Sequence, residues 1–131
     1  MIDLHVIEIE PEVRRWLELL PIKHHRKVEE YAELLATMGV RTPMPFARPL
    51  RNGVYELRPT FDGQATRVTY WFAPEHRIVL LTVFRKTRIH EENQVVRAVA
   101  ARTTCENEHD PAHLSYDRSD KNEKSEEGDA S

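Results

Sequence analysis

The fold of this chain is decided in its middle, by the stretches Leu50–Arg58 (LRNGVYELR), Thr66–Phe72 (TRVTYWF) and Ile78–Thr87 (IVLLTVFRKT). All three are short runs rich in β-branched and aromatic residues, which is typical of strands. Each also carries arginine or lysine, and a charged side chain in a strand must face water or a bound anion because burying it unpaired is costly. We therefore predict a sheet with one apolar face and one cationic face, a surface suited to a phosphate-rich ligand.

The segments around these runs complete a small α+β domain. Turn residues separate the runs, at Asp62-Gly63 and at Pro74–His76. The other predicted elements are a strand over 3–9, a helix from Pro11 to Pro21, a helix over 22–38 capped by Gly39, an extended proline-containing connector over 40–49 and a helix over 88–103. We expect a small antiparallel sheet with the two N-terminal helices packed on one face, a C-terminal helix, and the other face partly open.

Charge is distributed unevenly along the 131 residues. The net charge of −3 by itself argues against a nucleic-acid binder. Residues 106–131, however, hold nine acidic and three basic residues, a net of −6, so residues 1–105 carry +3. The C-terminal segment is also too polar to bury the apolar surface that would offset its ordering entropy. We predict a folded domain over 1–104 and an acidic, disordered tail over 105–131.

Cysteine content and hydropathy indicate the compartment. The single cysteine, Cys105, cannot form an internal disulfide. The N-terminus lacks an apolar signal core, and no apolar run reaches the length of a membrane span. These features predict a cytoplasmic protein that does not associate with membranes.

The strand motifs resemble a known family. The run Gly53–Arg58 after Leu50, the Arg67–Tyr70 segment, and Leu80–Lys86 with a helix after it are similar to the RelE/ParE superfamily of toxins, and within it to the HigB-like, phage Gp49-related branch. The resemblance covers most of residues 1–104. It implies a RelE-like, microbial ribonuclease-type fold and the toxin of a type II toxin–antitoxin pair, with a helix-turn-helix, HigA-like antitoxin as partner. It further implies a metal-independent endoribonuclease, an mRNA interferase, that acts on messenger RNA at the ribosome and needs no cofactor.

The same resemblance implies the site residues. Arg58, Arg67 and Lys86 match basic positions on the active-face strands and are the expected catalytic residues, while Arg51, Tyr70, Arg85, Arg88 and His90 are expected to contact RNA. The planar guanidinium suits phosphate oxygens, which it can bind in a bidentate way. The chain departs from the family pattern at Thr87, where a second lysine is common, and in residues 88–103, which contain no aromatic residue.

Alternatives remain open for the residues and for the function. Arg58 and Arg67 can instead pair with Glu56 or Glu75, Lys86 and His90 can be ordinary surface residues, and Tyr70 can be a core aromatic. The adjacent His24 and His25 point in different directions on a helix and make a poor pair of metal ligands, so we predict no metal site. The alternative functions are a ParE-like toxin directed at DNA gyrase and a catalytically degenerate binding module.

Overall fold

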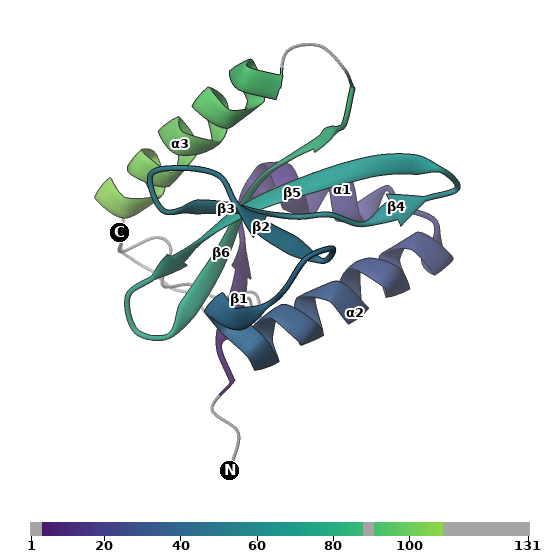
Figure 1. Cartoon of the computed structure of the whole chain (residues 1–131), viewed down its shortest axis with the longest axis horizontal. Coiled ribbons are helices and arrows are strands. Elements are labelled where there is room, and N and C mark those ends of the chain that lie inside the picture. Colours follow the sequence, from purple (N-terminus) through teal and green to yellow (C-terminus); the bar gives the residue numbers. More distant parts are fainter. Residues whose placement is uncertain (1–3, 88–90, 109–131) are drawn as a thin grey trace.

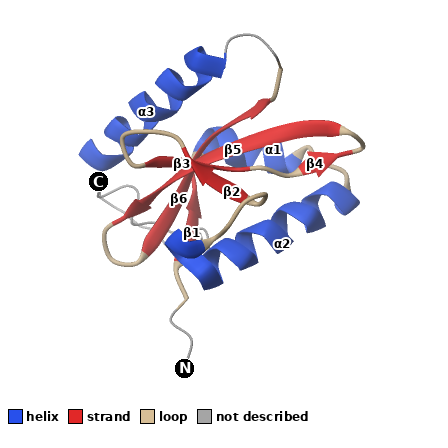
Figure 2. Cartoon of the chain, viewed as in Figure 1, coloured by secondary structure: helices blue, strands red, loops and turns tan. Residues whose placement is uncertain are grey.

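The computed structural model describes residues 4–87 and 91–108, which form an α+β fold (Figure 1). The fold class is therefore the predicted one. In chain order the elements are β1 (Val6–Ile9), α1 (Pro11–Glu18), α2 (Ile22–Met38), the 3-10 turn η1 (Gly39–Arg41), β2 (Ala47–Pro49), β3 (Val54–Leu57), β4 (Thr60–Phe61), β5 (Gln64–Ala73), β6 (Arg77–Arg85) and α3 (Glu91–Asn107). Figure 2 shows the strands crossing near the middle of the molecule with the helices around them.

The sheet is mixed rather than wholly antiparallel. Its strand order is β1-β6-β5-β3-β2, with the short β4 paired to β5 outside this path. All pairs are antiparallel except β1 and β6, which run parallel from Val6 opposite Arg77 to Ile9 opposite Leu80. A parallel pair needs a long connection, and here two helices and four strands lie between the partners. The prediction of an antiparallel sheet was thus wrong for its first strand.

Two short strands were also missed from the sequence. β2 lies at the end of the segment that its prolines marked as a connector, and its last residue is Pro49. Proline is tolerated there because β2 is an edge strand, which has one side without ladder hydrogen bonds. β4 has only two residues, too few for any alternation to be recognised. The bounds of α2, in contrast, are the predicted ones.

One sheet face packs against α1 and α2. The buried side chains on it come from α1, α2 and four strands: Val13, Leu35, Ala47, Leu57, Val68, Tyr70, Ile78 and Leu80. Alternate residues of β5, Val68 and Tyr70, belong to this face, as the two-residue period of a strand requires. This is the larger core, and it confirms that the N-terminal helices cover one face of the sheet.

The second face is divided into a covered and an uncovered half. α3 covers the half around Trp71, Val79 and Leu81, and contributes Cys105 to this smaller core. Figure 1 shows α3 and α2 on opposite sides of the sheet. Next to the covered half, Thr69 and Thr82 bury their hydroxyls against each other at 2.5 Å, beside a β-bulge in the β5–β6 pair. The face that we expected to be partly open is therefore open only beyond this threonine pair.

α3 is longer at its C-terminal end than predicted. The helix continues to Asn107 because Cys105, 6 % exposed, still packs on the sheet. The division into a 1–104 domain and a 105–131 tail stays a prediction, and residues 109–131 lie outside the described residues. Within 4–87 and 91–108, no helix combines the length and hydropathy that a membrane span requires.

Candidate functional site

Three arginines gather around one buried glutamate on the uncovered half of the second sheet face. We call Arg48, Arg58, Arg67 and Glu56 together the arginine cluster. Oε2 of Glu56 accepts hydrogen bonds from Nε of Arg48 and from Nη1 of Arg58, both at 2.8 Å. Nε of Arg67 lies 3.6 Å from the same oxygen. A single carboxylate oxygen therefore ties together side chains from β2, β5 and the residue after β3.

Strand register brings these residues together. Arg48 in β2 is the cross-strand partner of Glu56 in β3, and Glu56 is the partner of Thr69 in β5. Arg67 precedes Thr69 by two residues and Arg58 follows Glu56 by two residues, so all of them point to the same side of the sheet. The cluster is thus fixed by the backbone ladder of three adjacent strands.

The cluster carries an excess of buried positive charge. Arg67 is only 5 % exposed, and it also donates from Nη1 to the backbone carbonyl of Thr66 at 2.9 Å. Burial first, and then the neighbouring Arg58 charge, lowers the pKa of the Arg67 guanidinium, while Glu56 opposes that shift. The Arg67 guanidinium nevertheless stays protonated at physiological pH. One carboxylate for three guanidinium groups leaves an arrangement that a bound anion would stabilise.

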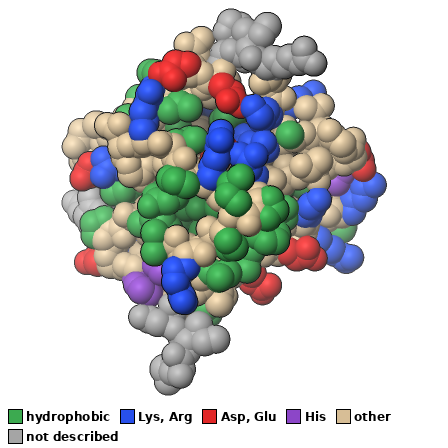
Figure 3. All heavy atoms as spheres, viewed as in Figure 1, with side chains coloured by type: hydrophobic (Ala, Val, Ile, Leu, Met, Phe, Trp, Pro, Cys, Tyr) green, Lys and Arg blue, Asp and Glu red, His purple; other side chains and the backbone are tan. Residues whose placement is uncertain are grey.

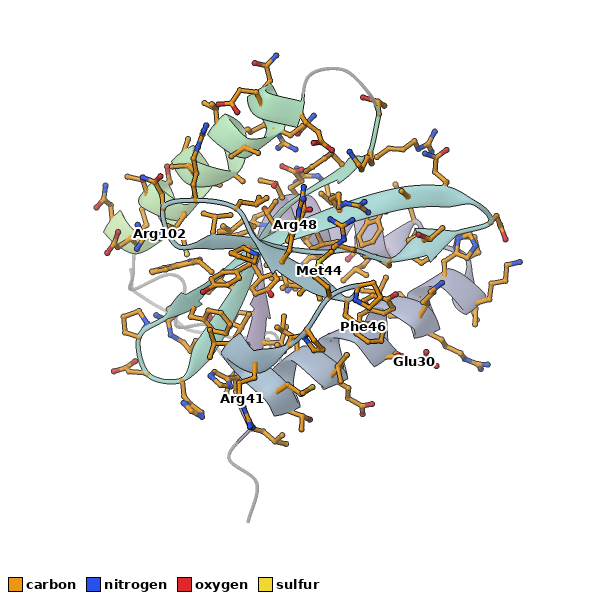
Figure 4. The ribbon with its side chains drawn as sticks, in the orientation of Figure 1. Glu30, Arg41, Met44, Phe46, Arg48 and Arg102 are labelled. Carbon is orange, nitrogen blue, oxygen red and sulfur yellow. The ribbon has the colours of Figure 1, made fainter. Side chains whose placement is uncertain are left out.

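The cluster is partly open to solvent. The side chains of Arg48 and Arg58 are 41 % and 19 % exposed, whereas that of Arg67 is 6 % exposed. Figure 3 shows Lys and Arg side chains gathered in one patch near the centre of the visible face, with acidic side chains beside it and hydrophobic side chains below. Figure 4 shows Arg48 projecting over the centre of the sheet, above Met44 and Phe46. A phosphate-bearing ligand with apolar groups fits such a surface.

Lys86 joins the cluster through Glu91. Lys86 follows β6 and forms an ion pair with Glu91, the first residue of α3. Hydrogen bonding by Lys86 lowers the pKa of the Glu91 carboxyl against the opposing effect of burial, and the charges of Arg48 and Arg67 act in the same direction as Lys86. The third predicted catalytic residue, Lys86, is therefore linked to Arg67 through a second carboxylate, that of Glu91.

The residues predicted to contact RNA are scattered. Arg51 pairs with Glu92 on α3. Arg85 is opposite Thr66 and lines a hollow on the α1–α2 side of the sheet, away from the arginine cluster. Arg88 and His90 lie outside the described residues.

Tyr70 is a core residue and is not available to RNA. Its side chain is 1 % exposed and stacks on Tyr55 at 5.5 Å between ring centroids, on the face that α1 and α2 cover. Burial raises the pKa of the Tyr70 hydroxyl. The prediction of an RNA contact was wrong, and the alternative of a core aromatic describes what the structure shows. Tyr70 is three residues from Arg67, so strand alternation alone places the two on opposite faces.

Arg48 and Glu56 are the members of the site that sequence reasoning missed as functional residues. Arg48 lies in the segment predicted as a connector, so nothing in the sequence assigned it to a face. For Glu56 the sequence indicates only a partner that would neutralise an arginine. The one available signal was a glutamate at an otherwise apolar strand position, because a buried acid requires a partner.

Metal binding finds no support in the part of the chain that the structure describes. No group of three or more His, Cys, Asp or Glu side chains there is arranged to hold a metal ion. The positive charge at the site comes from arginine and lysine.

Comparison with known protein families gives a match over most of the chain. The family described as "Phage derived protein Gp49-like" matches residues 15–103, which include the whole arginine cluster and Lys86. No curated protein sequence matches the chain.

Solved structures also resemble the chain. One is a chain of the RelBE2 toxin–antitoxin complex from Mycobacterium tuberculosis, with 25 % identity and a TM-score of 0.50, covering 64 % of this chain and 100 % of that one. Another is a double mutant of the E. coli toxin RelE in the free state, with 11 % identity and a TM-score of 0.54, covering 76 % of this chain and 98 % of that one. At 11 % identity the second likeness concerns the fold alone.

Proposed function

We propose, from the premise that this chain belongs to the Gp49-like, phage-derived family of the RelE toxin superfamily, that it is the toxin of a type II toxin–antitoxin pair and cleaves messenger RNA on the ribosome. The observation that carries the proposal is the arginine cluster. Its three guanidinium groups converge on one side of the sheet, where they exceed the charge of their shared carboxylate.

Such a cluster supports phosphoryl chemistry without a metal ion. When a ribose 2′-hydroxyl attacks the adjacent phosphate, negative charge grows on the phosphorane oxygens. Arginines that are already ordered stabilise this charge without reorganising during the reaction. Arg58 and Arg67 are the proposed residues for this role, and the order of Arg67 is supported by its burial and by its contact with the Thr66 carbonyl.

The reaction also needs proton transfers. A base must take the proton from the 2′-hydroxyl, and an acid must protonate the 5′-oxygen as it leaves. Lys86 is the proposed residue for charge stabilisation or proton transfer, since its ammonium group lies at the edge of the site with Glu91. His90, which lies outside the described residues, is a further proposed acid or base because imidazole titrates near neutral pH.

The partner and compartment follow from the same assignment. One of the similar structures is a toxin–antitoxin complex, which supports an antitoxin as partner of this chain. We propose that the antitoxin is of the helix-turn-helix, HigA-like kind, that the target is mRNA on cytoplasmic ribosomes, and that the reaction needs no cofactor. Gyrase poisoning is the competing function, and the concentration of three arginines around one carboxylate favours RNA cleavage over it.

The test compares wild type with Arg67→Ala and the control Arg26→Ala. Both variants lose one positive charge, but Arg26 is an exposed residue of α2 outside the arginine cluster. The chains are expressed from an inducible promoter, with growth followed alongside mapping of mRNA 5′ ends and of DNA breaks. Circular dichroism of the purified proteins monitors folding. We expect growth arrest and new mRNA ends for wild type and Arg26→Ala, and cleavage reduced about 100-fold or more for Arg67→Ala.

Other outcomes would change the assignment. Growth arrest with DNA breaks and no new mRNA ends would replace the nuclease with a gyrase-directed toxin. A folded wild-type protein that leaves growth unaffected would indicate a degenerate binding module. Equal cleavage by wild type and a folded Arg67→Ala variant would remove Arg67 from the site.

A further inference from the structure

We infer that Glu56 is a positioning residue, which holds Arg48 and Arg58 as the two arms of a clamp for one phosphate group. Arg48 thereby becomes a phosphate contact. The inference rests on the proposed function, because it concerns how the same site holds its RNA.

The hydrogen bonds of Glu56 are the first argument. Its carboxylate is 3 % exposed, and the same oxygen, Oε2, accepts from Nε of Arg48 and Nη1 of Arg58. Arg48 donates to Glu56 through Nε, which leaves its terminal Nη groups out of this hydrogen bond. Among the described residues these Nη groups have no hydrogen-bond partner, and neither does Nη2 of Arg58. Each arginine thus uses one donor for alignment and keeps others for a ligand.

The position of Arg67 is the second argument. It lies deeper than the other two arginines, with Nε 3.6 Å from Oε2 of Glu56 and buried without a hydrogen-bond partner in the described chain. Its Nη1 is directed to the Thr66 carbonyl. Arg67 therefore forms the floor of the cluster, and Arg48 and Arg58 form its more exposed arms.

The sign of the charge is the third argument. A carboxylate beside a phosphate site repels the phosphate, so on charge alone Glu56 weakens binding. Without it, however, three guanidinium groups would repel one another at short range, and the two exposed ones would turn to solvent. A fixed geometry is what makes arginine a bidentate ligand for phosphate. The two effects predict opposite results when the carboxylate is removed.

The experiment measures binding of a short single-stranded RNA with 2′-O-methyl groups throughout, which cannot be cleaved. Fluorescence anisotropy gives Kd for the full-length chain at several salt concentrations. The variants are Glu56→Gln, which removes the charge, and Glu56→Asp, which keeps the charge but draws it back by one methylene. The matched control is Glu92→Gln, which removes an exposed acid paired with Arg51.

We expect both Glu56 variants to bind about tenfold more weakly, since aligned hydrogen bonds to charged groups are lost. The slope of log Kd against log salt concentration falls by roughly 0.7, which corresponds to the loss of one phosphate contact on a single strand. Glu92→Gln binds equally or more tightly. Binding by Glu56→Gln that is equal to or tighter than that of wild type would overturn the inference, as would wild-type binding by Glu56→Asp.

A further variant covers the case in which Glu56→Gln does not fold. Arg48→Lys keeps both the charge and the partner of Glu56, but it replaces the planar fork by a point charge. We expect it to weaken RNA binding about tenfold as well, and wild-type affinity for this variant would overturn the clamp. If the wild-type chain does not bind the free RNA, the phosphate clamp fails, and the mapping of mRNA 5′ ends in cells decides the proposed function separately. If wild type binds and the variants bind equally well, only the role of Glu56 fails.

Discussion

Two buried glutamates on the same sheet face have very different surroundings. Glu8 in β1 accepts a hydrogen bond from Nη1 of Arg77 in β6 at 3.0 Å, and both side chains are at most 7 % exposed. Glu56 in β3 faces three arginines, two of them partly exposed. The first arrangement balances charge within the protein, whereas the second leaves positive charge for a ligand. A buried acid therefore indicates a ligand site only when the basic side chains around it outnumber the acid.

The wider surroundings of the two glutamates also differ in charge, since Glu8 lies in an acidic groove and Glu56 in a basic cluster. Glu8 lines a groove of about 540 Å³ between α3 and the β1–α1 segment, together with the acids Glu10, Glu12 and Glu108. In that groove Glu12 accepts hydrogen bonds from Arg97 at 2.6 Å and from the Val83 amide at 3.0 Å, which ties α1 to α3 and β6. The acidic groove would repel the anion that the arginine cluster attracts. Under the proposed function, the RNA would thus be directed to the half of this face that holds the arginine cluster.

The largest expected effect in this comparison is on stability, from Arg77→Met. Removing the arginine breaks the buried ion pair between Glu8 and Arg77, which costs about 3–5 kcal/mol of unfolding free energy. RNA affinity of the folded protein stays unchanged, because Arg77 is at the other end of the sheet face. Urea denaturation and the anisotropy measurement together check this. A cost below about 1 kcal/mol, or a loss of RNA affinity in the folded variant, would contradict the view that Glu8 serves stability and Glu56 serves ligand binding.

A smaller effect is expected from Arg102→Met, in the half of the face that α3 covers. The Arg102 guanidinium lies 4.6 Å from the centre of the Trp71 ring. Methionine keeps the contact area but loses the cation–π attraction, so we expect a cost of about 1–2 kcal/mol in urea denaturation. Glu106→Gln is the matched control, because it breaks only the helical Arg102–Glu106 pair and costs about 0.5 kcal/mol or less. Equal effects of the two substitutions would show that the Trp71 contact contributes nothing.

The smallest effect concerns the counter-charge of the cluster, in Glu91→Gln. Hydrogen bonding by Lys86 lowers the folded-state pKa of Glu91 below its ordinary value of 4.5. A lowered carboxyl pKa stabilises the fold above pH 4.5, and this contribution is lost as pH falls through the folded-state pKa. The pair is partly exposed, so the contribution is at most about 1 kcal/mol.

Thermal denaturation from pH 7 to pH 3 measures this contribution. The difference in Tm between wild type and Glu91→Gln should be greatest above pH 4.5 and vanish in acid. A difference independent of pH would show that the ion pair with Lys86 is not its source. RNA affinity at low salt should rise up to about threefold in the variant, because Lys86 is released from its carboxylate.

Much of the fold could be predicted because its signals are local. Helical spacing and Gly39 fixed the bounds of α2, and the apolar strand runs fixed β3, β5 and β6 to within a few residues. The parallel pairing of β1 could not be read in this way, since strand direction depends on how the whole chain is connected. The resemblance supplied Arg58, Arg67 and Lys86 as candidates, but not the geometry that relates them.

The sequence by itself determined which residues carry charge inside strand patterns, and strand alternation placed Arg67, Thr69 and Trp71 on one face and Tyr70 on the other. Only the tertiary structure decided that Arg48 joins them and that α3 covers Trp71. The physical reason is that alternation is a property of one strand. The register between strands depends on contacts between residues far apart in the chain, and so does the position at which a helix packs on the sheet.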